Sequence, residues 1–458
     1  MKKFFLHPLA LAAASLSIAS LAQAQQAASN DAAASTTTPA ATNTAPASNG
    51  GTLGGLFNAP GTTGSSSQLS ATPSYELAGI GRRDATQERI LTSATNGLPI
   101  RFDNGIYVYT SATGGLGHNS NVSGVNTGAI SSNFYSVQPE VVGELKKAGD
   151  RYTLRYAGNY TKYTGSSADN FNHHFFDLAG DNYFDSRTRL GWDLGYVDQT
   201  DARGSTSVTV NTPNRWTAPT ARALLAYGAP QAQGRVELEG NYVQKRYQNN
   251  RDVTASFDTD LTTVSGRFFY RVMPRTSMIF ELRQTNADYK TATISTNTDR
   301  RYYVGATWEA TAKTSGTFKI GYAEKKFSNA PIKATGVSWE GGLRWSPLTY
   351  STFDLITSKA PADSTGVGNY LMNTATSLQW NHRWASNLSS RASVGTVKTD
   401  FSGAGRTDTT NNVGIGAFYE LGRNWRAGAE YTYTDRSSNQ NTFNFNRNVT
   451  YVSIQGTL

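Results

Sequence analysis

The first residues to weigh for chemistry are the histidines beyond the N-terminus, which are His118, His173, His174 and His382. A hydrolase needs a His beside a nucleophile that it activates, and a metal site needs several ligands that converge on one ion. His173 and His174 are adjacent, so on a β-strand they point to opposite faces and cannot hold the same ion. None lies in a recognisable motif, and the chain has no Cys. We therefore expect no enzyme, no metal site and no cofactor.

The charged side chains follow a period of two instead. In the stretch RLGWDLGYVDQ, residues 189–199, the even positions up to 196 are apolar, whereas the odd positions carry Arg189, Asp193 and Gln199. Val197 is the one apolar residue at an odd position. Successive side chains of a strand point to opposite faces, so this segment is predicted to be a strand with one apolar and one polar face.

Segments of this kind recur from residue 105 to the end of the chain, with no convincing helical stretch between them. Approximately eighteen strands are predicted, at 105–117, 132–146, 151–163, 171–184, 188–200, 215–229, 233–246, 257–272, 276–289, 299–311, 315–327, 334–346, 350–360, 369–383, 388–400, 409–422, 425–436 and 445–457. A soluble sandwich of this many strands would need a core richer in Val, Ile and Leu. The apolar faces are therefore expected to contact lipid.

The connections between these segments alternate between short and long. Tight turns such as KKAGD and FDSR alternate with longer polar loops such as HNSNVSGVNTGAIS and DARGSTSVTVNTPN. Short turns on one side and longer loops on the other are typical of outer-membrane barrels, which also have an even number of strands. The fold predicted is all-β, a transmembrane antiparallel up-and-down barrel of about eighteen strands, with both termini on the short-turn side.

Aromatic residues are predicted to form a girdle at each membrane interface. Trp345, Trp384 and Trp425 lie beside short turns. The girdle at the long loops is predicted to contain Tyr163, Tyr247, Tyr289, Phe327, Phe401 and Tyr433.

Two prolines, Pro139 and Pro219, fall inside predicted strands. Proline has no N–H to donate, and a closed barrel has no edge strand on which that hydrogen bond is not needed. These prolines are interpreted as markers of bulges or strand ends.

The N-terminal part of the chain differs in composition from the rest. Residues 1–24 combine Lys2 and Lys3, an apolar stretch and the sequence Ala-Gln-Ala, which is typical of a secretory signal peptide cut after Ala24. Residues 25–75 are rich in Ala, Ser, Thr, Pro and Gly and are predicted to be a disordered linker. Residues 76–104 are predicted to be a periplasmic lead-in segment before a barrel at 105–458.

The formal net charge is +9, and removal of the two signal-peptide lysines leaves +7. The Lys and Arg residues sit singly on alternating strands, so no nucleic-acid partner is expected. The side chains predicted to face inward are Arg155, Arg189, Asp193, Arg222, Glu237, Glu239, Arg267, Arg271, Glu281, Arg283, Glu340, Arg344, Arg391, Arg426 and Glu430. They are open to two interpretations, a lumen that attracts anions or a ladder of Arg–Glu pairs that keeps the barrel closed.

Residues 151–205 resemble the Putative beta-barrel porin 2 family. The similar features are an R-Y start after a K-x-G-D turn, an S-A-D-N-[FY] loop, an S-R-T-x-L turn and a D-x-R-G-S exit. Residues 116–122 are similar to the family's Y-D-x-N-V segment, although His118 and Ser120 depart from it, and residues 131–141 account for Pro139. The resemblance implies an outer-membrane barrel associated with exopolysaccharide or capsule biosynthesis, and it brings no catalytic residues.

Two functions therefore remain open. The first is a channel or accessory in exopolysaccharide or capsule export, with an anionic polysaccharide and periplasmic export components as partners. The second is a general diffusion porin for small solutes that mildly favours anions. General porins constrict the lumen with a long inward-folded loop, and the longest loops here, 118–131 and 201–214, are short for that role. In either case we expect the outer membrane of a Gram-negative bacterium, with membrane lipid and the barrel-assembly machinery as partners and the N-terminal linker in the periplasm.

Overall fold

The computed structural model describes residues 99–204, 210–229, 232–311, 313–364 and 366–457. The predicted signal peptide, the linker and most of the lead-in segment lie outside these residues. Among the described residues, no helix has the length and hydropathy needed to cross a membrane.

The described chain is almost entirely strand. The strands are β1 (Ile100–Phe102), β2 (Ile106–Asn119), β3 (Ser132–Lys147), β4 (Asp150–Tyr163), β5 (Phe171–Tyr183), β6 (Thr188–Asp201), β7 (Asn214–Tyr227), β8 (Gly234–Tyr247), β9 (Thr259–Met273), β10 (Thr276–Tyr289), β11 (Asn297–Thr311), β12 (Thr314–Phe327), β13 (Lys333–Leu348), β14 (Ser351–Asp363), β15 (Tyr370–Ala385), β16 (Leu388–Ser402), β17 (Arg406–Glu420), β18 (Trp425–Ser438) and β19 (Phe445–Thr457). Single helical turns lie between some of them, at η3 (Asp103–Gly105), η4 (Ser167–Asp169), α4 (Arg251–Thr254), η5 (Ala255–Phe257), η6 (Thr293–Ser295) and η7 (Asn441–Phe443).

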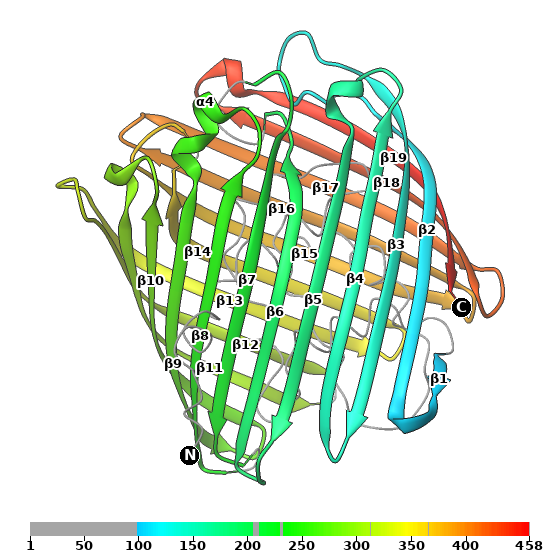
Figure 1. Cartoon of the computed structure of the whole chain (residues 1–458), viewed down its shortest axis with the longest axis vertical. Coiled ribbons are helices and arrows are strands. Elements are labelled where there is room, and N and C mark those ends of the chain that lie inside the picture. The colour runs from blue at the N-terminus through cyan, green and yellow to red at the C-terminus, as the bar shows by residue number, and fades with distance from the viewer. Residues whose placement is uncertain (1–98, 205–209, 230–231, 312, 365, 458) are drawn as a thin grey trace, which may run out of the picture.

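Strands β2 to β19 form one closed antiparallel barrel (Figure 1). Each strand pairs with its sequence neighbours, and β19 pairs with β2 from Val449↔Asn119 to Thr457↔Ser111, which closes the sheet. The sheet has nineteen strands, and without the short β1 eighteen remain in the barrel wall. The predicted fold class is confirmed, and no predicted strand end differs from the observed one by more than three residues.

Strand β1 was not anticipated by the sequence pattern. It forms a tight hairpin with β2 and pairs Ile100↔Val108 and Phe102↔Ile106. These positions of β2 lie beyond the reach of β19, whose pairing stops at Ser111. The segment therefore supplies backbone partners to the exposed lower edge of β2, where the last strand is too short to do so.

The interpretation of Pro139 and Pro219 as bulges or strand ends was wrong. Both lie inside long strands, where their pairing with one neighbouring strand is complete. On the other side the ladder is interrupted, between Val137↔Tyr160 and Glu140↔Ala157 for β3, and in the same manner between β7 and β8. The register is identical before and after each gap. Each proline therefore costs local hydrogen bonds but shifts no side chain to the other face.

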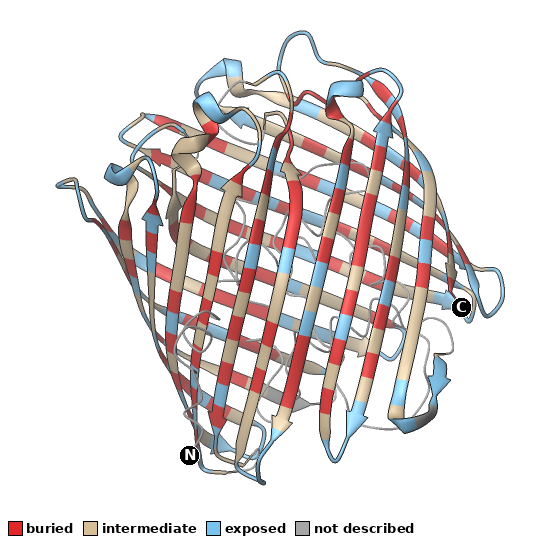
Figure 2. Ribbon diagram, viewed as in Figure 1, coloured by how far each residue is buried: buried red, intermediate tan, exposed pale blue. Residues whose placement is uncertain are grey.

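Buried and exposed positions alternate along the strands of the wall (Figure 2), and the two faces differ in chemistry, as the alternation predicts. On β8, Val236 and Leu238 are about half exposed, whereas Glu237 and Glu239, which alternate with them, are buried. The charged face is the inner one, because Lys319 of β12 reaches Glu281 of β10, and side chains of strands two apart converge only on the concave side of a barrel.

The predicted aromatic girdle at the long loops is largely wrong. Tyr163, Tyr247, Tyr289, Phe327 and Phe401 are all buried on the inner face, and only Tyr433 faces outward. They occupy the same parity as the inward charged residues of their strands, and the apolar character of the rings had concealed this. At the short turns, by contrast, Trp345, Trp384 and Trp425 are exposed on the outer face, as predicted.

The turns at the short-turn rim have local structural causes. The β3–β4 turn places Ala148 at φ 52° and Gly149 at φ 91°, a pair of positive φ values that a two-residue hairpin turn requires. In the β5–β6 turn, the Asp185 carboxylate accepts bonds from the backbone N–H groups of Arg187 and Thr188. These bonds hold the pKa of the Asp185 carboxyl below its ordinary value.

Two inner-face glycines offer a matched test of the strand packing. A Cβ at Gly321 of β12 would lie 1.7 Å from the Tyr302 carbonyl oxygen, whereas a Cβ at Gly336 of β13 would meet nothing within 4 Å. We expect Gly321→Ala to lower the free energy of unfolding by about 1–3 kcal/mol. Gly336→Ala should be neutral or stabilising by about 0.5–1 kcal/mol. Urea unfolding of the refolded barrel in detergent, followed by circular dichroism, measures both, and equal stability of the two variants would contradict this packing.

Candidate functional site

The inner wall carries a continuous chain of ion pairs across eight neighbouring strands, β6 to β13. It consists of seven residues, here named the ion-pair girdle: Asp193, Arg222, Glu239, Arg267, Glu281, Lys319 and Glu340. Each residue comes from a different strand, and β11 is the only strand of the eight that contributes none.

Several contacts in the girdle are short and fully buried. Arg222 Nε lies 2.7 Å from Glu239 Oε1, and Arg267 Nη2 lies 2.5 Å from Glu239 Oε2. Lys319 Nζ lies between two carboxylates, 2.7 Å from Glu281 Oε2 and 2.9 Å from Glu340 Oε2. Six of these seven residues were predicted to face inward, and Lys319 was missed.

The other predicted site residues lie on the same face, most of them in ion pairs, of which those of Glu237 and Arg283 join the girdle. Arg155 pairs with Glu140 and Asp177, Arg189 with Asp181, Glu237 with Arg235 and Arg267, Arg283 with Glu281 and Glu340, Arg344 with Asp354, Arg391 with Glu430, and Arg426 with Glu420. Arg271 lies near the short-turn rim, where its backbone pairs with Gln233. That these residues line a conducting lumen stays a prediction.

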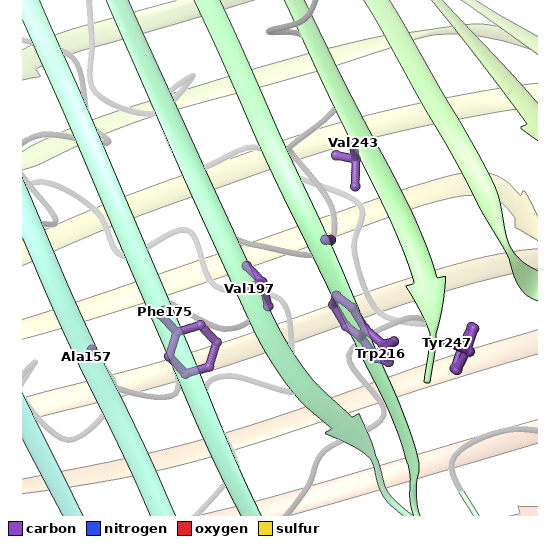
Figure 3. Packing of buried hydrophobic residues seen from close by; sticks show 7 residues of the cluster. Ala157, Phe175, Val197, Trp216, Val243 and Tyr247 are labelled. Atoms are coloured by element: carbon purple, nitrogen blue, oxygen red, sulfur yellow. The ribbon is translucent and has the colours of Figure 1, made fainter. Parts of the chain in front are cut away.

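One part of the inner wall is apolar. The side chains of Ala157, Phe175, Val197, Trp216, Ala218, Val243 and Tyr247 pack together on β4 to β8 below the long-loop rim (Figure 3). Val197, the exception in the alternation of residues 189–199, belongs to this cluster and is 4% exposed. Asp201 lies at its edge and accepts hydrogen bonds from Trp216 Nε1 at 2.9 Å and Tyr247 Oη at 2.7 Å.

Another part of the inner wall, on β15 to β19 and β2, is rich in uncharged polar side chains. This uncharged arc contains Asn373, Ser377, Gln379, Asn381, Ser393, Thr399, Asn412, Thr432, Thr434, Gln455, Ser111 and Thr113, all of them buried. Amides and hydroxyls of this kind both donate and accept hydrogen bonds. This part of the wall also holds ion pairs such as Arg391–Glu430, so its uncharged polar side chains are interspersed with charges, whereas β6 to β13 carry the continuous ion-pair girdle.

The loop between β2 and β3, residues 120–131, folds its base over the inner wall. Val122 is 5% exposed and packs among inward-facing side chains that include Phe134, Tyr163 and Tyr451. Asn121 fixes this position, because its Nδ2 donates to the carbonyls of Val125 at 2.8 Å and Asn446 at 3.0 Å. The base of the loop, residues 121–124, is therefore packed inward at the barrel mouth, whereas residues 126–129 at its tip are exposed.

Segments quoted for the family resemblance meet each other in space. Asp169 of the S-A-D-N-F loop accepts two hydrogen bonds from the guanidinium of Arg203 in the D-x-R-G-S exit, one of them 2.8 Å long from Nε. Gly124 of the inward loop packs directly against Gly204. Asn121 and Val122 are the N-V pair of the family-like segment. These motifs therefore hold the long loops together at the mouth.

Three further inner-face arginines, Arg406, Arg436 and Arg447, form a group that the sequence reasoning missed. We name them the arginine cluster. Arg436 continues the inward parity of Arg426 and Glu430 on β18, so an extension of the predicted alternation to the end of that strand would have found it. All three lie at the long-loop ends of β17, β18 and β19.

The histidines are dispersed over the barrel. His173 is buried on the inner face, where Thr200 N donates to its Nε2 at 3.1 Å, whereas His174 lies on the outer face beside Tyr156, as the alternation predicts. His118 is exposed, and His382 packs among outward aromatic rings. Within the described ranges, no three His, Cys, Asp or Glu side chains are grouped to hold a metal ion.

A closed transmembrane barrel with a polar inner face defines an outer-membrane channel of the porin type. Residues 105–457 match the family described as Putative beta-barrel porin 2, and the chain belongs to this family. A search of curated proteins finds no match.

Among solved structures the chain is similar to other outer-membrane barrels. It matches OccK2 (OpdF) of Pseudomonas aeruginosa with 13% identity and a TM-score of 0.44, over 77% of this chain and 98% of that one. A BenF-like porin from Pseudomonas fluorescens Pf-5 matches with 11% identity and a TM-score of 0.46, over 77% and 99% of the two chains. OprD of Pseudomonas aeruginosa matches with 11% identity and a TM-score of 0.42, over 79% and 97%.

The ion-pair girdle predicts a specific stability change. Lys319→Met removes the cation between Glu281 and Glu340 and leaves buried carboxylates with fewer partners, so we expect a loss of about 3–5 kcal/mol in the free energy of unfolding. The control is Lys398→Met, because Lys398 is 56% exposed and pairs with an exposed Asp400, and its loss should cost about 1 kcal/mol or less. Urea titration of both variants in detergent tests this, and a Lys319→Met barrel as stable as the control would show that the girdle does not stabilise the wall.

Proposed function

We propose that this protein is a passive diffusion channel for small polar solutes that mildly favours anions. The observation that carries the proposal is the inward-packed base of the β2–β3 loop, residues 121–124, with Val122 packed on the inner wall. A loop that narrows the mouth of a wide barrel is what a diffusion channel needs in order to exclude large solutes while passing small ones. The short loop length, which had weighed against a porin, is offset by where the loop lies.

The polar wall supports the same proposal. Its Arg and Lys side chains are mostly paired with carboxylates. The wall is therefore polar enough to be wetted, but it has no strong electrostatic potential of one sign. The arginine cluster adds positive charge at the mouth, and this supports a mild preference for anions. We propose no catalytic role, because the histidines lie apart on different faces and at different heights of the barrel.

Export of an exopolysaccharide or capsular polymer is the second candidate. The uncharged arc supports it, because amide and hydroxyl side chains are suitable partners for sugar hydroxyls along an extended chain. Under this proposal the partners are an anionic polysaccharide and periplasmic export components, which residues 25–104 would reach from the periplasmic side. The inward loop weighs against it, because a polymer needs the mouth to open.

The inward loop gives a conductance prediction. Asn121→Ala removes the hydrogen bonds to Val125 and Asn446, which should destabilise the packed loop base by about 1–3 kcal/mol and increase the fraction of time it is released. We expect larger and noisier single-channel currents from the purified full chain in planar bilayers. Thr127→Ala is the control, because Thr127 is exposed at the tip of the same loop. Equal currents in both variants would show that the loop does not narrow the conducting path.

An experiment in cells distinguishes the two candidate cargoes, small solutes and polysaccharide. A strain without the gene is complemented with the wild-type chain, and polysaccharide is measured in the medium and in the periplasm together with small-solute uptake. Diffusion predicts slower uptake and unchanged polymer in both pools. Less polymer in the medium, more in the periplasm and recovery on complementation would instead favour export.

A further inference from the structure

We propose that the arginine cluster is an oxyanion-binding site at the long-loop mouth of the channel. It would take the carboxylate, phosphate or sulfate group of a solute that enters or leaves. The proposal deepens the diffusion function and rests on it only for its physiological meaning, because binding at the site can be measured without any current.

The position of the cluster is fixed by three consecutive strands. Arg436 lies opposite Thr410 of β17 and Phe445 of β19, and Arg447 lies opposite Thr434 of β18. The loop that joins β18 and β19 contains η7, and Asn126 of the inward loop donates to the Asn441 carbonyl at 3.1 Å. The cluster therefore lies directly below the place where two loops meet at the mouth.

Aromatic rings hold the guanidinium groups in place. The Cζ atom of Arg406 lies 3.3 Å from the centre of the Phe443 ring and 4.2 Å from that of Phe401. Arg436 and Arg447 share the Phe445 ring, at 4.4 and 5.7 Å from its centre. Cation–π contacts stabilise arginines against rings but supply no negative charge.

The positive charge of the cluster is only partly balanced by carboxylates, in contrast to the charge of the ion-pair girdle. Arg406 binds Asp408 through two hydrogen bonds, one of them 2.8 Å long from Nε. Arg436 Nε donates to the Phe443 carbonyl at 2.9 Å, which satisfies a donor but not the charge. Among the described residues, Arg447 Nε is buried without a hydrogen-bond partner. Arg406 thus has a carboxylate partner, whereas Arg436 and Arg447 form no ion pair among the described residues, and a guanidinium that is partly removed from water favours a nearby anion.

The geometry of the groups indicates the chemical class of that anion. Guanidinium is a planar fork of donors that matches the oxygens of a carboxylate, phosphate or sulfate. The guanidinium groups of Arg436 and Arg447 both lie against the Phe445 ring, and two such groups are suited to an anion with several oxygens. Such a group can belong to a small free anion or to an acidic sugar in a polymer, and the experiment distinguishes the two.

The test uses the full chain purified in detergent, with inorganic phosphate as the small probe in isothermal titration calorimetry. Arg447→Gln and Arg436→Gln are each expected to weaken phosphate binding by about tenfold or more. Arg383→Gln is the matched control. Arg383 also lies on the inner wall with an Nε that has no hydrogen-bond partner among the described residues, but it is at the short-turn rim, away from the cluster. It should leave phosphate binding within about twofold of the wild-type value.

Each outcome decides the proposal. Loss of binding in the two cluster variants but not in Arg383→Gln supports the site, even if bilayer experiments find no current and the diffusion function fails. Equal weakening in all three variants would overturn it in favour of a general effect of wall charge, and so would a wild-type chain that binds no phosphate. An oligogalacturonate titrated in parallel identifies the source, because a polymer cargo predicts tighter binding than phosphate and the same loss in the cluster variants.

Discussion

The rest of the structure depends on one requirement, that every backbone N–H and C=O within the membrane is bonded inside the protein, because lipid offers no partner. Closure of β19 on β2 meets this requirement for the whole wall, and β1 extends it where β19 is too short. Pro139 and Pro219 are local exceptions. They are tolerated because the register continues unchanged past each gap, and a shift of one residue would have turned charges toward lipid.

The same strand geometry concentrates charge on the concave face. There the charges are partly removed from water and are stabilised by the ion-pair girdle, in which each carboxylate or cation pairs with one on a nearby strand. The pairs therefore belong to the architecture of the wall. Selectivity is more reasonably sought where pairing is incomplete, and the arginine cluster gathers three guanidinium groups at one such place among the described residues.

The mouth is organised by residues that are distant in the sequence. The inward loop is fixed by Asn121 to the start of β19, and Arg203 joins the β6–β7 loop to Asp169 of the β4–β5 loop. Asn121, Asp169 and Arg203 lie in the segments whose sequence resembles the family. The contacts of these residues give the segments a structural role, because the contacts hold the long loops in position at the mouth of the barrel.

The sequence by itself determined the barrel, its strand count and the facing of most side chains, because a period of two is a local property of each strand. It also determined the exposed Trp residues at the short turns. Tertiary structure decided which way the aromatic rings at the long-loop rim face. They point inward with the other inward side chains of their strands, although the rings are apolar. It also decided that Val197 joins an inner apolar cluster, that Lys319 bridges two carboxylates and that Val122 turns inward. Those outcomes depend on which strands become neighbours around a closed wall, and no local pattern in the sequence encodes that proximity.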